Sequence, residues 1–161
     1  MARIVGARGI VAIKWPNDVL IDGAKVSGTL IEAHHSALCV GIGINVARRP
    51  DIGGYPTTHL SRFTELDKNS LVAELIAEWR IIHTAWVARG FSDLIAEYNE
   101  SLYLLNQEMR LSVDREKALW ISGLCRGVDE CGRLILEDPN GMRSVHLVGD
   151  VDAPTSRSAD V

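Results

Sequence analysis

A tight turn between two apolar runs constrains the fold of this 161-residue chain more than any other feature. Asp22 and Gly23 form a dipeptide that favours a two-residue hairpin turn, because the central positions of such a turn need a positive φ. Apolar runs occupy 19–21 before the turn and about 25–33 after it, and another fills 38–46. The pattern predicts a β-meander with short connections.

The polar stretch before this turn, KWPND, is the first candidate for a functional site. A strand over 10–15 should end at Pro16, which has no amide donor. Because the hairpin folds back on itself, Lys25 can approach Asn17 or Asp18. A lysine held by a carboxylate can stabilise negative charge that grows on a phosphate. From the spacing alone, a solvated surface hairpin with a weak ion pair remains the simpler interpretation.

Glycines and one asparagine on the following strands form a second candidate. Gly28, Gly41 and Gly43 can leave a slot for a small molecule, because glycine lets a ligand approach the backbone closely. Bulges or barrel corners are the alternative interpretation. Asn45 offers a donor and an acceptor, which match the paired edge of adenine, although a strand-end turn residue is the simpler interpretation.

The rest of the chain is expected to add helices and then short strands. Helical spacing over 71–86 predicts a helix that Asn69 or Ser70 caps, with its tryptophans in the core, and a second helix is expected over 92–102. After residue 106 the pattern changes to short strands between turn signals, which predicts a small antiparallel barrel. The strands are expected at 108–113, 119–128, 133–137 and 144–148.

Composition excludes several other classes of protein. The net charge of −4 gives no general attraction to nucleic acid or to an anionic membrane. No apolar run reaches the ~20 residues that a membrane helix needs. Cys39, Cys125 and Cys131 contain no CxxC pair, so we expect reduced thiols, no zinc site and a cytoplasmic location.

Several motifs together resemble one enzyme family. The segments KWPNDVLIDGAKVSGTLIEA and VGIGINV resemble the catalytic domain of biotin protein ligases, and ISGLCRGVDECGRLILE with VHLVGDV resembles the family's C-terminal barrel. The resemblance covers about residues 2–151. It implies an α+β fold: a partial mixed or antiparallel sheet with packing helices, of the class II synthetase type, over 1–105, then an SH3-like barrel over 106–151. A disordered tail is expected over 152–161.

The resemblance also implies a reaction. Biotin and ATP would give biotinyl-5'-AMP, and a lysine of a biotin carboxyl carrier domain would then take the biotin. Mg²⁺ would offset the triphosphate charge. Lys25 and Asp18 would be the catalytic residues, with Lys25 contacting both the α-phosphate and the biotin carboxylate.

The remaining implied roles concern binding. Asn17, Lys25 and Asn45 would bind ATP, with Asn45 reading the adenine. Gly28 and Gly41 would let the rings of biotin lie against the backbone beside Lys25. Asn17 would help to bind the nucleotide phosphates or metal, and the resemblance implies no dedicated metal-binding residue.

Two family segments have no counterpart in the sequence. A GRGRxGR-like segment that precedes KWPND in the family is absent, and so is a winged-helix DNA-binding domain. We therefore expect the C-terminal portion of a ligase, impaired alone, with open apolar surface that favours a homodimer or pairing with the missing N-terminal half. The alternatives are a non-catalytic fragment, a half of a split ligase that binds a partner chain or carrier domain, and a lipoate-type ligase, against which the KWPND segment argues.

Overall fold

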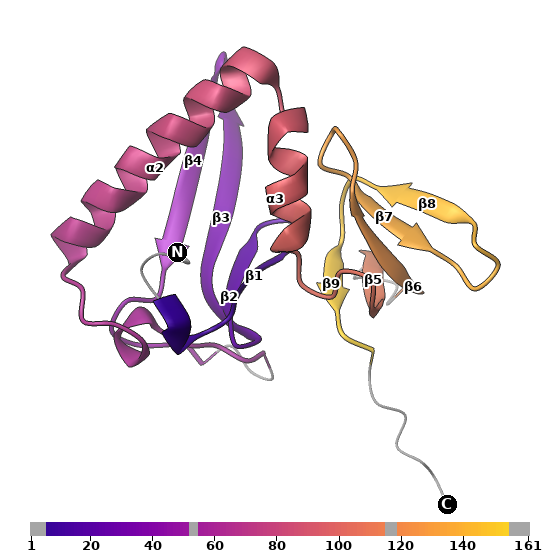
Figure 1. Ribbon diagram of the computed structural model, residues 1–161, viewed down its shortest axis with the longest axis horizontal. Helices are drawn as coiled ribbons and strands as arrows, with labels where there is room; N and C mark the ends of the chain where they lie inside the picture. The colour runs from indigo at the N-terminus through magenta and orange to yellow at the C-terminus, as the bar shows by residue number, and fades with distance from the viewer. Residues whose placement is uncertain (1–5, 52–54, 115–118, 155–161) are drawn as a thin grey trace, which may run out of the picture. The chain divides into compact units, whose positions relative to one another are not determined.

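The computed structural model describes residues 6–51, 55–114 and 119–154, which form two compact units, Met1–Gly90 and Phe91–Val161 (Figure 1). The first contains η1 (Gly6–Arg8), β1 (Val11–Lys14), β2 (Asp18–Ile21), β3 (Ala24–His34), β4 (Ala37–Ile44), η2 (Leu60–Arg62) and α2 (Lys68–Arg89). The second contains η3 (Ser92–Leu94), α3 (Ile95–Glu100), β5 (Glu108–Asp114), β6 (Leu119–Val128), β7 (Leu134–Glu137), β8 (Arg143–His146) and β9 (Asp150–Asp152). The predicted α+β class is confirmed.

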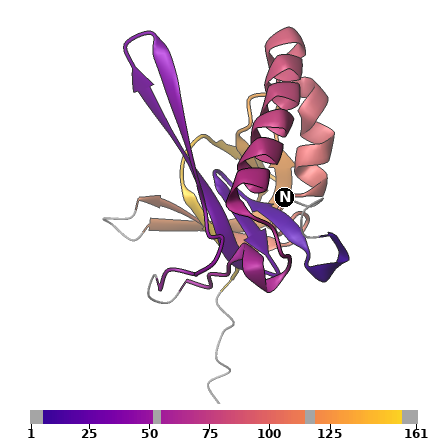
Figure 2. The same ribbon diagram turned by 90° about the vertical axis from the view of Figure 1, so that its left-hand side faces the viewer.

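The first sheet is the predicted meander, with strand order β1-β2-β3-β4 and antiparallel neighbours. Asp22 and Gly23 have φ values of +51° and +75°, which confirms the predicted turn between β2 and β3. His35, with φ +51°, lies in the tight turn between β3 and β4. Figure 2 shows the ribbon of β3 and β4 extending well past β1 and β2.

The core of the first unit lies at the base of this sheet, where the site begins. Its buried cluster joins strand residues to the η2 segment and to the start of α2. These residues are Ile21, Val26, Leu60, Phe63 and Leu71. The base of the sheet is therefore the rigid part from which the β3–β4 ribbon projects.

Helix α2 begins at a different cap from the one predicted. The N-cap is Asp67, whose carboxylate accepts hydrogen bonds from the Asn69 and Ser70 amides. The hydrogen bond from the Ser70 hydroxyl, together with these two, lowers the pKa of Asp67. The prediction of Asn69 or Ser70 was wrong because an aspartate just upstream can reach both amides. The predicted end at Gly90, with φ +77°, is confirmed.

The tryptophans of α2 do not lie in a core. Trp79 is 45% exposed and Trp86 is 47% exposed, so the prediction that they are core residues is wrong. Leu71 is the one buried residue of α2, all of which the structure describes. The ribbon also exposes Leu30, Ile31 and Leu38. The expectation of open apolar surface is therefore confirmed along α2 and the ribbon.

The second unit carries an antiparallel sheet in the order β8-β7-β6-β5-β9. Strands β5 to β8 confirm the four predicted strands within two residues at each end. The helix predicted over 92–102 divides into the 3-10 helix η3 and the α-helix α3, which ends at Glu100. Strand β9 was not predicted, and its last residue, Asp152, is the first of the predicted tail, of which 155–161 lie outside the described residues. The SH3-like barrel stays a prediction.

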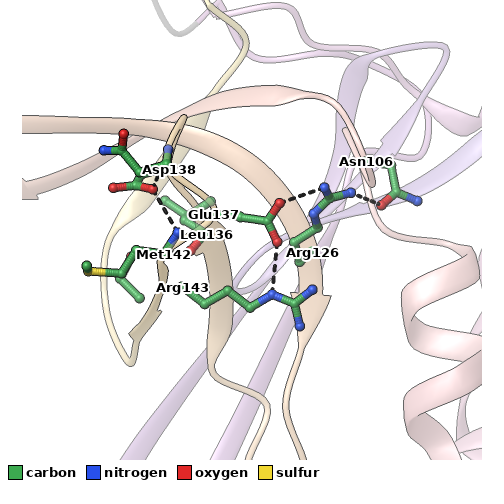
Figure 3. Close-up of polar contacts among 9 residues, drawn as sticks. Asn106, Arg126, Leu136, Glu137, Asp138, Met142 and Arg143 are labelled. Atoms are coloured by element: carbon green, nitrogen blue, oxygen red, sulfur yellow. Dashed lines mark hydrogen bonds and ion pairs between the residues drawn. The ribbon is translucent and has the colours of Figure 1, made fainter.

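A carboxylate held by two arginines ties β6, β7 and β8 together (Figure 3). Arg126 Nη2 lies 2.8 Å from Glu137 Oε1, and Arg143 Nε lies 2.9 Å from Glu137 Oε2. Arg126 Nη1 also donates to Asn106 Oδ1 at 3.1 Å. The hydrogen bonds from Arg126 and then Arg143 lower the pKa of Glu137 to about 2.

Among the residues that the structure describes, no helix combines the length and the apolar character of a membrane span.

Candidate active site

The predicted site residues converge on one cavity of the first unit. Asp18, Gly28 and Gly43 are register partners across β2, β3 and β4. A cavity of about 470 Å³ opens on these strands. Its lining is Asn17, Asp18, Lys25, Gly28, Thr29, Leu30, Gly41, Ile42 and Gly43. Of the six residues that the resemblance assigns, this lining includes all but Asn45.

An ion pair lies in the lining of the cavity, over a glycine. Lys25 Nζ lies 2.6 Å from Asp18 Oδ1, with the side chains 29% and 13% exposed. A Cβ at position 28 would lie 3.1 Å from that oxygen and 3.2 Å from Nζ. Glycine at position 28 therefore makes room for the ion pair to lie across the strand. The result is a fixed cation at the edge of a hollow that can take an anionic group.

Asn17 is held in place by a reciprocal pair of hydrogen bonds with β3. Its Nδ2 donates to the Thr29 carbonyl at 2.8 Å, and the Thr29 amide donates to the Asn17 carbonyl at 2.9 Å. These bonds continue the pairing of β2 and β3 to the residue before the start of β2. They fix the Asn17 side chain at the rim of the cavity, with its Oδ1 as the remaining acceptor.

Asn45 is not part of the lining of the cavity, and its side chain binds backbone groups. Its Nδ2 donates to the Thr58 carbonyl at 3.1 Å and to the Lys25 carbonyl at a longer 3.5 Å. Lys25 also forms a parallel bridge with Thr57. None of the elements predicted from the sequence includes residues 55–58, so this contact was not predicted. No local signal reveals it, because it is made by backbone groups of residues far apart along the chain.

Side chains that could bind a metal ion are dispersed over the described part of the chain. Within it, no three or more His, Cys, Asp or Glu side chains form a group that could hold a metal ion. Cys39 and Cys131 are exposed, Cys125 is buried, and all three are free thiols. Burial raises the pKa of the Cys125 thiol.

Comparisons with known proteins first define the class of the domain. The sequence model of the Biotin/lipoate A/B protein ligase family matches residues 6–47, which contain β1 to β4 and the cavity. The apo biotin protein ligase of Aquifex aeolicus has a similar fold, with a TM-score of 0.78 and 26% identity over 89% of this chain and 65% of that one. Its complex with biotin and ATP gives a TM-score of 0.76 at 25% identity, covering 88% of this chain and 61% of that one.

Within that class, the sequence relatives are more specific. The biotin–[acetyl-CoA-carboxylase] ligase of Paracoccus denitrificans is 31% identical over 87% of this chain and 62% of its own length. The bifunctional ligase/repressor BirA of Escherichia coli is 30% identical over 85% of this chain and 45% of its own length. The chain is similar to the biotin protein ligases over most of its length, as its motifs predicted. It spans about half to two-thirds of the length of the ligases it matches.

Proposed function

We propose that this chain takes part in the ATP-dependent attachment of biotin to a lysine of a biotin carboxyl carrier domain. One observation carries the proposal: Asn17, Asp18, Lys25, Gly28 and Gly41 line a single cavity on a scaffold similar to biotin protein ligases. The cavity combines a fixed cation with an apolar and glycine-lined floor. Such a site suits a ligand with a carboxylate or phosphate at one end and an apolar ring at the other.

Two steps of group transfer make up the proposed reaction. A carboxylate oxygen of biotin bonds to the α-phosphorus of ATP as the bond from that phosphorus to the β-phosphate oxygen breaks, and pyrophosphate leaves. The amine of the carrier lysine then attacks the acyl carbon, an amide forms, and AMP leaves with the former carboxylate oxygen. Lys25 would stabilise the charge that builds on the α-phosphate. Asp18 would hold the Lys25 ammonium in position through the 2.6 Å ion pair.

The nucleotide would occupy the rim of the cavity near Asn17. The Asn17 amide oxygen is available to a phosphate-bound cation, and Asn45 Oδ1 is available to the amine of adenine. Mg²⁺ typically binds through a few protein oxygens plus substrate phosphates. Asn17 and Asp18 would supply the few protein oxygens, and the phosphates of ATP would supply most of the other ligands of Mg²⁺. The three free thiols favour a cytoplasmic location.

Transfer of biotin to a carrier domain tests the proposal directly. The purified chain is incubated with ATP, labelled biotin and a carrier domain, and protein-bound label is counted. We expect Lys25→Ala to lower the rate of biotinyl-adenylate formation by about 10²- to 10³-fold, because it removes the charge-stabilising donor. Lys68→Ala, at the exposed start of α2, is the matched control. An unchanged rate in Lys25→Ala would reject the assigned role.

A second candidate function rests on the exposed apolar surface. Ile31, Leu38 and Trp79 are each at least 45% exposed, which is typical of surfaces that another chain covers. The chain would then be a non-catalytic partner that completes a ligase with a second chain or with a second copy of itself. Transfer that appears only when the part of the Paracoccus ligase without a counterpart here is added would favour this candidate.

A further inference from the structure

A segment far along the chain takes the place of β4 beside Lys25. Strand β4 ends at Ile44, whose partner in β3 is Ser27. Next to Lys25, the neighbouring segment is 56–58, which runs parallel to β3. The Lys25 amide donates to the Pro56 carbonyl at 2.8 Å, and the Thr58 amide donates to the Lys25 carbonyl at 2.9 Å. The amide and the carbonyl of Lys25 are thus both bonded to this one segment.

Asn45 lies where β4 gives way to this segment. The backbone amide of Asn45 donates to the Val26 carbonyl at 2.8 Å, and its backbone carbonyl accepts from the Leu60 amide at 2.9 Å. Its Nδ2 carries two hydrogens, and the acceptors within reach are the carbonyls of Lys25 and Thr58. The side chain therefore bridges the strand that carries the lysine and the segment that flanks it.

The flanking segment is well anchored. Thr57 and Thr58 are buried, and Thr57 Oγ1 donates to the Pro50 carbonyl at 2.7 Å. The ring of Tyr55 covers the buried Lys14, whose Nζ lies 4.3 Å from the ring centre. A buried and hydrogen-bonded segment of this kind transmits position better than a mobile loop does.

We propose that Asn45 is a positioning residue for Lys25, which it holds through the backbone carbonyl rather than through a ligand. The inference rests on the proposed function for the meaning of Lys25, and it goes beyond the adenine-reading role. The paired edge of adenine needs a donor and an acceptor. Because Nδ2 faces the backbone carbonyls, only Oδ1 is left for a base. Without the bridge, the Lys25 backbone shifts, and Nζ moves away from Asp18 Oδ1.

Chemical labelling of lysine tests this without any ligand. The chain is treated briefly with an amine-acylating ester, and labelling at each lysine is followed by mass spectrometry. In Asn45→Ala, we expect Lys25 to react several times faster, because its amine is released from the ion pair. Asn45→Asp retains oxygen acceptors but has no donor, so it should behave like Asn45→Ala. Asn69→Ala, at an exposed asparagine of α2, is the matched control.

Two other lysines report on side effects of the substitutions. Buried Lys14 should stay slow in a folded variant, and exposed Lys68 should react at a constant rate. Should Asn45→Ala unfold, Lys14 would react as well, and the milder Asn45→Ser replaces it. A Lys25 rate equal to that of the wild type in every folded variant overturns the proposal.

Ligand binding then separates this inference from the proposed function. Calorimetry compares ATP with inorganic tripolyphosphate in the wild type, Asn45→Ala, Lys25→Ala and the double variant. A positioning residue weakens both ligands alike, by about 3- to 10-fold, and has no further effect once Lys25 is absent. Selective loss of ATP, or additive losses, overturns it. A wild-type chain that binds neither ligand rejects the proposed function, while the labelling result still decides the role of Asn45.

Discussion

At the scale of single residues, position 28 shows that a missing side chain can define a site. Gly28 was predicted to let biotin approach the backbone, and that role stays a prediction. The structure adds a different reason for glycine, because the Lys25–Asp18 ion pair lies over this position. The spacing of the motif brings the two charges near each other. The spacing cannot reveal that the side chains of Asp18 and Lys25 meet above Gly28. That arrangement depends on the bulge at Val19 and Leu20, which shifts the register of β2 and β3.

Replacing this glycine should therefore displace the ion pair. In Gly28→Ala the new methyl group lies 3.1–3.2 Å from Asp18 Oδ1 and Lys25 Nζ, so one of the two side chains must move. We expect a loss of ATP affinity of about 10- to 100-fold, the range for losing a hydrogen bond to a charged group. The melting temperature should not fall, because alanine costs less chain entropy than glycine in a strand.

Gly43→Ala provides the comparison for this displacement. A Cβ there has its nearest neighbour, the Gly28 carbonyl, at 3.9 Å, which is an ordinary contact. Acylation of Lys25 should therefore be faster than in the wild type only in Gly28→Ala. Equal labelling of Lys25 in the two variants would show that the ion pair does not depend on position 28.

At the scale of elements, local signals predicted the strands well and distant contacts poorly. The Asp22-Gly23 turn fixed the β2–β3 hairpin, because both residues accept a positive φ. Strand β9 has three residues and exists through its pairing with β5, so its own composition gives little sign of it. Segment 56–58 escaped prediction for the same reason, since backbone hydrogen bonds to a distant strand leave no pattern in the residue types.

The β6–β8 carboxylate cluster predicts a dependence of stability on pH. Arg126 and Arg143 lower the pKa of Glu137 from 4.5 to about 2, so the folded state favours the ionised form. This contribution is fully present above about pH 4.5 and is lost as the pH falls from about 4.5 to about 2. We expect the melting temperature of the wild type to fall through that window.

Glu137→Gln tests the assignment of this pH dependence. The variant lacks the titrating group, so its melting temperature should be lower at neutral pH and change less between about pH 4.5 and pH 2. Glu97→Gln, at an exposed position of α3, is the control and should retain the wild-type profile. Identical profiles for Glu137→Gln and the wild type would assign the acid dependence to other carboxylates.

At the scale of the whole molecule, the open apolar surface should affect association. Ile31 and Val40 are direct cross-strand partners on one face of the β3–β4 ribbon, and both are exposed. We expect the chain to self-associate as its concentration rises, and the paired change Ile31→Thr and Val40→Thr to reduce this. Threonine preserves strand propensity, so the fold should persist. Sedimentation velocity over a concentration series measures the effect.

The opposite face of the same ribbon supplies the control. Glu32 and Cys39 are also direct partners, one position nearer the turn between β3 and β4, so their side chains point the other way. Glu32→Thr with Cys39→Thr should leave association as it is in the wild type. Equal changes from both pairs would mean that the apolar face has no special part in association.

The parallel contact beside Lys25 also has a consequence for the order of folding. The hairpin around Asp22 and Gly23 closes a minimal loop, whereas the bridge from Lys25 to Thr57 needs the chain to return from a distance. Short loops close sooner, because less chain entropy is lost. A newly made chain would therefore have its hairpin before its lysine is anchored. Pulse-labelling during refolding should show β2–β3 amides protected first, and the ability to bind ligand would arrive last.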